Sequence, residues 1–168
     1  NIQKISGWPL RLLSVACLSL AAKLEEPLVP SLVDLQVEEG GKFIFEPRTI
    51  KRMELLVLTV MDWRLRSVSP FCYIAFFSRK IDPSGSCSGI LTSGAKEIIL
   101  STIKESSRLI EYRPSCVAAA AVLYAATDLP SLSFLTAQHA VSWSDGLHKE
   151  HIMSCYQVMN EMGSKSNS

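Results

Sequence analysis

The stretch LLSVACLSLAAKLEE, residues 12–26, decides the fold class of this chain. Every residue between Arg11 and Lys23 is apolar or small, so the segment has no polar face for water. It is therefore predicted to be a helix surrounded by other helices. The segment is shorter than the roughly 20 apolar residues that cross a bilayer. Its end changes to the charged sequence KLEE, and Pro27 stops the helix. Because a buried helix holds terminal charges in a fixed place, we expect the functional site at this end.

Composition limits the class of protein. The 168 residues are 48 % hydrophobic and carry a formal net charge of +1, which suits one large or two small globular domains. No segment is densely basic, so neither nucleic acid nor a membrane surface is expected as the main partner. The five cysteines form no CxxC pair, and most lie in apolar helical patterns. This usage favours a reduced, intracellular protein.

Hydrophobic periodicity predicts helices along the chain and no strand with two-residue alternation. After the first helix we expect further helices at residues 31–36, 47–61, 71–80, 91–110, 115–127, 134–141 and 147–162. Loops are expected at 38–42 and at the Gly/Ser/Pro-rich segment 82–88, and a polar tail at 164–168. The predicted fold class is all-α.

Two of these helices carry a predicted core stripe at helical spacing. In the helix at 47–61 the stripe consists of Ile50, Met53, Val57 and Val60. In the helix at 91–110 it consists of Ala95, Ile98, Ile99 and Ile103. The helix at 47–61 also has a second stripe, formed by Lys51, Glu54, Leu55 and Leu58. A stripe that mixes charge with leucine suits a partner surface better than plain solvent.

The chain contains an internal repeat. SVACLSLAAK at residues 14–23 aligns with AAAAVLYAAT at 118–127, and each is an apolar central helix with a proline before and after it. Two helices precede the central helix of the second copy and have no counterpart in the first. The copies also differ in charge, since Lys23 of the first copy stands where the second has Thr127. This asymmetry predicts a contact that only the first unit makes.

The segments LSLAAKLEE, VPSLVDLQ and FEPRTIKRMELLVLTVMDWRL together resemble the cyclin box, most closely that of a plant D-type cyclin. The resemblance covers nearly the whole chain and implies tandem cyclin-box helical units. Residues 1–66 are expected to hold the last three helices of a first box truncated at its N-terminus. Residues 67–168 are expected to form a C-terminal cyclin-like domain of five helices, after a linker at 62–69. Two missing helices would leave apolar faces of residues 12–22 bare.

The resemblance implies a non-catalytic regulatory subunit that binds and activates a cyclin-dependent protein kinase in control of the G1/S transition. The implied assembly is a heterodimer with the kinase, in the nucleus and also in the cytoplasm. In cyclins a lysine and a glutamate hold the mobile regulatory helix of the kinase, and apolar neighbours line the same groove. The matching kinase-binding residues here are Lys23, Leu24, Glu54, Leu58 and Leu65. The resemblance implies no catalytic residue, metal, cofactor or small-molecule substrate.

Other interpretations stay open at this point. The chain is alternatively a truncated cyclin-like protein that folds or binds a partner but does not activate a kinase. Lys23 and Glu54 also have a purely structural explanation, as a dipole partner at a helix end and a side chain on a wet helix face.

Two further alternatives concern other classes of protein. A metal site or hydrolytic enzyme is suggested by the spacing i, i+3 and i+7 of His148, His151 and Cys155, although no fourth ligand is evident. A cyclin-like box that binds DNA would need a basic face. The densest basic cluster consists of Arg48, Lys51 and Arg52, which also suits the solvated start of a helix.

Overall fold

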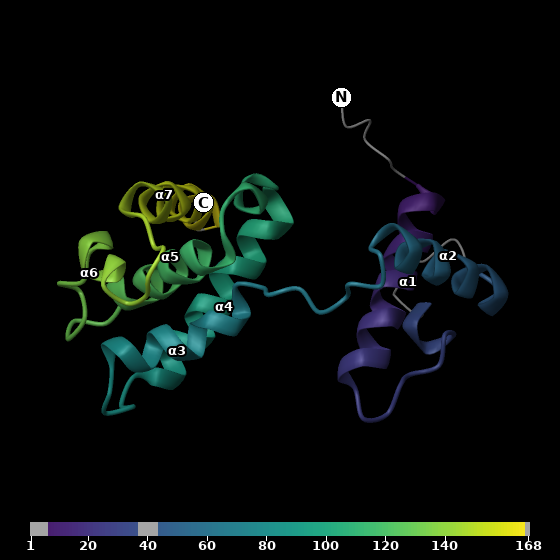
Figure 1. Cartoon of the computed structure of the whole chain (residues 1–168), viewed down its shortest axis with the longest axis horizontal. Coiled ribbons are helices and arrows are strands. Elements are labelled where there is room, and N and C mark those ends of the chain that lie inside the picture. The colour runs from purple at the N-terminus through teal and green to yellow at the C-terminus, as the bar shows by residue number, and fades with distance from the viewer. Residues whose placement is uncertain (1–6, 37–43, 167–168) are drawn as a thin grey trace. The chain divides into compact units, whose positions relative to one another are not determined.

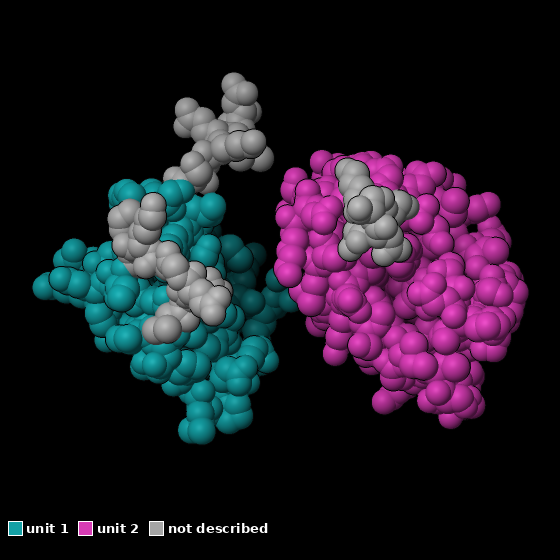
Figure 2. Space-filling model, turned by 180° about the vertical axis from the view of Figure 1, so that it is seen from behind, with its two compact units in different colours: residues 1–67 teal, residues 68–168 magenta. Residues whose placement is uncertain are grey.

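The computed structural model describes residues 7–36 and 44–166, and all regular secondary structure in these ranges is helical (Figure 1). The all-α prediction is therefore confirmed, while the loop expected at 38–42 lies outside the described residues. The chain divides into two compact units, residues 1–67 and 68–168, which Figure 2 colours teal and magenta. Within the described ranges, no helix combines the length and apolar character needed to span a membrane.

The first unit packs α1 (Trp8–Glu25) against α2 (Pro47–Val60), with the short 3-10 helix η1 (Asp34–Gln36) beside α1 (Figure 1). Both α-helices have a proline in their first turn, where its missing N–H removes no helical hydrogen bond. The buried core consists of Leu12, Val15, Ala16 and Ile50, with Leu32, Phe45 and Met53 packed against it.

Only one face of α1 is covered, which corrects the expectation that other helices surround it. The buried residues are Leu12, Val15, Ala16, Ser19, Leu20 and Ala22, on the side where α2 and η1 pack. Leu10, Leu13 and Leu18 are exposed. The bare apolar face that the cyclin resemblance predicts for residues 12–22 is therefore present in this unit.

The segment between α1 and α2 is held by side chains rather than by a full helix. The Ser31 hydroxyl accepts the N–H of Asp34 at 3.2 Å and donates to its carboxylate at 2.6 Å, as an N-cap does. The helix predicted at 31–36 is nevertheless reduced to the three residues of η1. The buried Gln36 side chain then accepts the N–H of Phe45 at 2.6 Å and donates to the Phe45 carbonyl at 3.1 Å. These two bonds hold the chain just before α2 begins.

The core face of α2 differs from the predicted stripe. Ile50, Glu54 and Leu58 are buried at i, i+4 and i+8, whereas Val60 is exposed and Met53 and Val57 are half-buried. The predicted stripe is therefore confirmed at Ile50 and Met53, which belong to or pack against the core, and is wrong at Val60, because the buried face follows Ile50, Glu54 and Leu58 instead. The second predicted stripe is divided as well, since Lys51 and Leu55 face solvent while Glu54 and Leu58 face α1.

In the second unit, α5 (Pro114–Thr127) is surrounded by other helices (Figure 1). Its neighbours are α3 (Phe71–Ile81), α4 (Ser88–Glu105), α6 (Ala137–Val141) and α7 (Lys149–Ser166). Every residue from Cys116 to Leu123 is buried. The prediction of an apolar central helix at 115–127 is therefore confirmed.

Several helix ends differ from the predicted bounds. The helix expected at 91–110 ends at Glu105, and the separate 3-10 helix η2 (Arg108–Glu111) follows it. Ile103 is exposed, and Thr102 takes the buried position because its hydroxyl donates to the Ile98 carbonyl at 2.6 Å. The polar tail expected at 164–168 is helical as far as Ser166, and its last two residues lie outside the described ranges.

The close packing of α4 on α5 gives a first prediction. A methyl group added at Gly94 would lie 3.1 Å from the Ala125 Cβ, whereas one at Gly89 on the same helix would meet nothing within 4 Å. We expect Gly94→Val to destabilise the second unit by about 1–3 kcal/mol through overpacking, and Gly89→Val to leave its stability unchanged. Urea unfolding followed by circular dichroism compares the two variants. Equal midpoints for the two would contradict this account of the α4–α5 contact.

Candidate functional site

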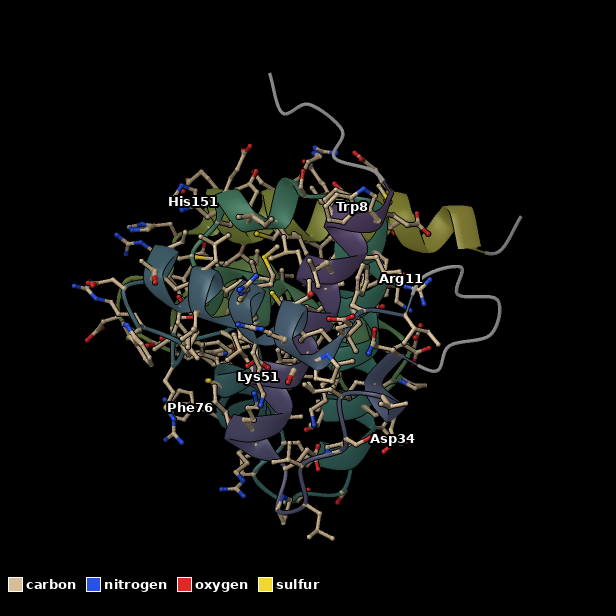
Figure 3. All side chains as sticks on the ribbon, turned by 90° about the vertical axis from the view of Figure 1, so that its right-hand side faces the viewer. Trp8, Arg11, Asp34, Lys51, Phe76 and His151 are labelled. Carbon is tan, nitrogen blue, oxygen red and sulfur yellow. The ribbon has the colours of Figure 1, made fainter. Side chains whose placement is uncertain are left out.

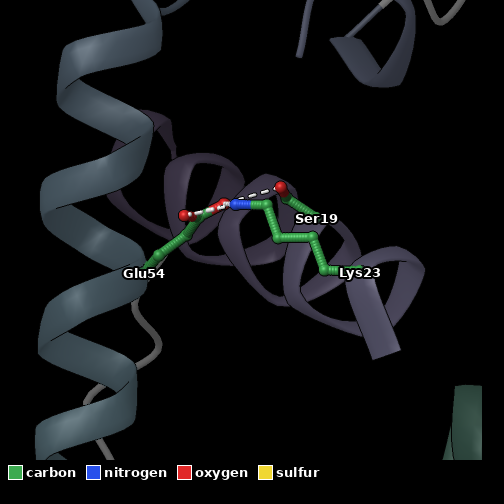
Figure 4. A network of polar contacts seen from close by, with 3 residues as sticks. All are labelled: Ser19, Lys23 and Glu54. Carbon is green, nitrogen blue, oxygen red and sulfur yellow. Dashed lines mark hydrogen bonds and ion pairs between the residues drawn. The ribbon is translucent and has the colours of Figure 1, made fainter. Parts of the chain in front are cut away.

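A buried carboxylate joins the two helices of the first unit. Glu54 on α2 accepts hydrogen bonds from the Lys23 ammonium at 2.6 and 2.7 Å, one on each carboxylate oxygen (Figure 4). The Ser19 hydroxyl also donates to one of these two oxygens, Oε1, at 2.6 Å. Ser19 and Lys23 lie four residues apart on α1, so both point toward α2 from one face of the helix.

The charges of this contact differ in exposure. The Glu54 side chain is only 8 % exposed, while the Lys23 side chain is 41 % exposed. A buried carboxylate is costly unless it is paired and hydrogen-bonded, and both conditions are met here. A lysine carries three donors, of which two are directed at Glu54. The contact therefore includes a positively charged side chain with one further donor, and this side chain is partly exposed at the surface of the unit.

A groove of about 740 Å³ opens beside this ion pair. It is lined by Leu20, Lys23, Leu24, Leu58, Trp63, Arg64, Leu65, Arg66 and Ser67. Four of the five residues predicted from the cyclin resemblance line it, and the fifth, Glu54, is bonded to Lys23 at its edge. The first unit thus brings the predicted residues together at one groove.

A strained turn builds one wall of the groove. Asp62 and Trp63 follow α2 with φ of 51° and 57°, a left-handed conformation that residues other than glycine seldom adopt. The N–H of Trp63 bonds the Leu58 carbonyl at 2.9 Å, and that of Asp62 bonds the Thr59 carbonyl at 3.2 Å. This is the Schellman arrangement, with aspartate where glycine is usual. It reverses the chain sharply and places Trp63 and Leu65 on the groove.

Three residues at this site were not predicted from the sequence: Ser19, Trp63 and Arg64. Ser19 lies within an apolar run, where a serine gives no sign of a partner 35 residues away. The sequence DWR, residues 62–64, contains no glycine to indicate a left-handed turn, and it lies within the segment 62–69 that was predicted as a linker. Arg64 pairs with Asp62 at 3.1 Å on the exposed side of the turn.

Both units match models of known protein families. The model of the cyclin N-terminal domain matches residues 2–66, and that of the cyclin C-terminal domain matches residues 68–168. This chain belongs to the cyclin family. The matches and the all-helical structure confirm the prediction of tandem cyclin units.

Curated relatives of this cyclin are plant D-type cyclins, as the sequence resemblance predicts. Cyclin-D1-1 of Arabidopsis thaliana is 58 % identical over 169 residues, which cover 99 % of this chain and 49 % of the relative. Cyclin-D1-1 of Oryza sativa subsp. japonica is 52 % identical over 91 % of this chain and 43 % of the relative. Cyclin-D2-1 of the same species is 49 % identical over 93 % of this chain and 46 % of the relative. The chain spans just under half the length of these relatives.

The alternative of a metal site finds little support in the C-terminal helix of this cyclin. His151 lies at the surface (Figure 3), whereas Cys155 is fully buried, so the imidazole and the thiol differ in their access to solvent. Burial, together with the nearby Cys116, raises the pKa of the Cys155 thiol to about 12. At neutral pH this thiol is protonated and is a poor metal ligand. Among the described residues, no group of three His, Cys, Asp or Glu side chains is arranged to hold a metal ion.

The basic cluster considered for DNA binding is the exposed start of α2. Arg48, Lys51 and Arg52 all face solvent there, and Lys51 is labelled in Figure 3. Their exposure agrees with the solvated start of a helix.

The strained turn gives a second prediction. We expect Asp62→Val to destabilise the first unit by about 1–2 kcal/mol, because a β-branched residue fits the left-handed conformation poorly. Asp62→Gly, which adopts this conformation freely, should be at least as stable as the wild type. Urea unfolding measures both variants. A valine variant as stable as the glycine variant would show that the turn is not strained.

Cysteine reactivity gives a third prediction. Hydrogen bonds from the backbone and then the hydroxyl of Ser69 lower the pKa of the exposed Cys72 thiol. We expect Cys72 to react rapidly with a thiol reagent at pH 8, and Cys155 to react only after unfolding, since the thiolate is the reactive species. Mass spectrometry of the labelled native chain identifies the modified residues, and Cys72→Ser should remove the label at this position while the exposed Cys17 is still labelled. Labelling of Cys155 in the folded chain would contradict its burial.

Proposed function

We propose that this chain is the kinase-binding part of a D-type cyclin, a non-catalytic regulatory subunit that binds and activates a cyclin-dependent protein kinase at the G1/S transition. The proposal includes a heterodimer with the kinase and action in the nucleus. The observation that carries it is the groove of the first unit, which combines Lys23, Leu24, Leu58 and Leu65 beside the Lys23–Glu54 pair. Membership of the cyclin family and similarity to plant D-type cyclins support the choice of partner.

The apolar part of the groove suits one face of a partner helix. Leu24 from α1, Leu58 from α2 and Leu65 from the following segment line it from three directions. Trp63 is 68 % exposed at the groove, and large aromatic residues are frequent anchors of protein interfaces. Covering such leucines contributes roughly 25 cal/mol per Å² of apolar surface removed from water. Docking of an amphipathic helix is the binding mode that this shape favours.

The charged part of the groove suits the polar groups at the end of a helix. The last carbonyls of a helix have no partner within it, and the third donor of the partly exposed Lys23 side chain suits them. Glu54 is buried behind Lys23 and holds the lysine in place from Oε1 and Oε2. The lysine thus supplies orientation, while the leucines supply most of the buried area.

Activation follows from preference for one kinase conformation. A cyclin that binds the inward position of the mobile kinase helix better than the outward one shifts the population toward the active state. In that state the kinase completes the ion pair between its own lysine and glutamate, which orients the nucleotide phosphates. In this proposed mechanism the chain acts only through its difference in affinity for the two kinase conformations and contributes no catalytic group.

Two leucine variants give a fourth prediction. Leu24 lines the groove and is 39 % exposed, whereas Leu28, four residues further on, is 88 % exposed and lies outside it. We expect Leu24→Glu to weaken binding to a cyclin-dependent kinase by about 100-fold or more, because the partner would bury an unpaired charge. Leu28→Glu should bind as the wild type does. Co-purification and titration calorimetry with a recombinant monomeric kinase measure the effect.

The outcomes separate the proposal from its main alternative. Absence of wild-type binding, or equal binding by both glutamate variants, would overturn the kinase-binding groove. Binding that does not stimulate phosphate transfer to a peptide would instead support a cyclin-like chain that binds without activating.

A further inference from the structure

Ser19 uses its hydroxyl in an unusual way for a helical serine. Ser14, on the exposed side of the same helix, donates to the Leu10 carbonyl four residues back at 2.9 Å. This local bond is the common choice for a serine within a helix. Ser19 instead donates across to Glu54 Oε1 on α2 at 2.6 Å, and it is fully buried. The hydroxyl therefore satisfies a group in the neighbouring helix rather than in its own.

This bond fixes the orientation of the Glu54 carboxylate beside the groove. Oε1 accepts from both Ser19 and Lys23 and so has its two acceptor sites filled, whereas Oε2 accepts from Lys23 alone (Figure 4). Ser19 and Lys23 both donate to Oε1, and Lys23 also donates to Oε2, so these two side chains of α1 set the orientation of the carboxylate plane. The oxygen with capacity left is Oε2.

Ser19 also reduces the dependence of the Glu54 carboxylate on hydrogen bonds from Lys23. A buried carboxylate held by Lys23 alone would depend on that single ammonium for all its neutralisation and hydrogen bonding. A partner that competes for the ammonium would then leave the carboxylate poorly satisfied. With Ser19 donating to Oε1, the carboxylate keeps a second donor while Lys23 turns one of its protons toward a partner.

We propose that Ser19 is a positioning residue for kinase binding, which holds the Glu54 carboxylate so that the Lys23–Glu54 pair meets the kinase helix already oriented. The inference rests on the kinase-binding function proposed above and assigns a role to a residue that makes no contact with the kinase itself. Pre-orientation of an interface group strengthens binding because less freedom is lost in the complex.

The test compares Ser19→Ala with the matched control Ser14→Ala on the same helix. We expect Ser19→Ala to weaken binding to a recombinant cyclin-dependent kinase by about tenfold in titration calorimetry, and Ser14→Ala to leave it unchanged. A double-mutant cycle with Glu54→Gln distinguishes positioning from a general loss of structure. If Ser19 acts through Glu54, removing its hydroxyl has little further effect once the carboxylate is gone.

Each result has a defined meaning. Equal affinity of Ser19→Ala and the wild type overturns this inference alone, as does a tenfold loss that persists unchanged in the Glu54→Gln background. Absence of binding by the wild type overturns the proposed function and this inference with it. If Ser19→Ala reduces the helix content of the free chain, Ser19→Thr decides, because it keeps a hydroxyl at that position. Wild-type affinity of a folded threonine variant supports positioning, and loss of its affinity contradicts it.

Discussion

The first unit depends on the burial of one carboxylate between its two long helices. Glu54 has little access to water, so α1 and α2 must pack in the one rotation that brings Ser19 and Lys23 to it. That rotation turns Ile50 and Leu58 toward α1 and leaves the opposite face of α2 exposed. The contact that holds the unit together is thus the same contact that places Lys23 on the groove. Stability and the proposed binding function share these residues.

The two central helices show how similar sequences acquire different surroundings. α5 is enclosed by α3, α4, α6 and α7, and nearly all of it is buried, whereas α1 is covered on one face by α2 and η1. The positions aligned by the repeat also behave differently. Thr127 bonds the Tyr124 carbonyl of its own helix at 2.6 Å, while Lys23 reaches across to another helix. At these aligned positions only the first unit makes a charged contact between helices, which is the difference that the asymmetry of the repeat predicts.

The groove also depends on backbone strain. A left-handed aspartate followed by a left-handed tryptophan is retained although glycine would fit with less strain. Two backbone hydrogen bonds to the end of α2 hold the turn in place. As a consequence, an aromatic side chain lies at the groove where a glycine would leave none. Strained residues of this kind cluster at binding sites, where surrounding structure over-determines them. Trp63 fits that description.

The sequence by itself determined the all-α class, most helices and the cyclin family, and it predicted a functional site at the end of the run 12–26. These features follow from periodicity, proline positions and a family pattern, all of which are local or linear. Only the tertiary structure decided that Glu54 is a core residue, that Val60 is not, and that Ser19 completes the ion pair. The physical reason is that a carboxylate enters a core only when donors satisfy it, and the donors to Glu54 lie 31 and 35 residues away, so hydrophobic spacing carries no record of them.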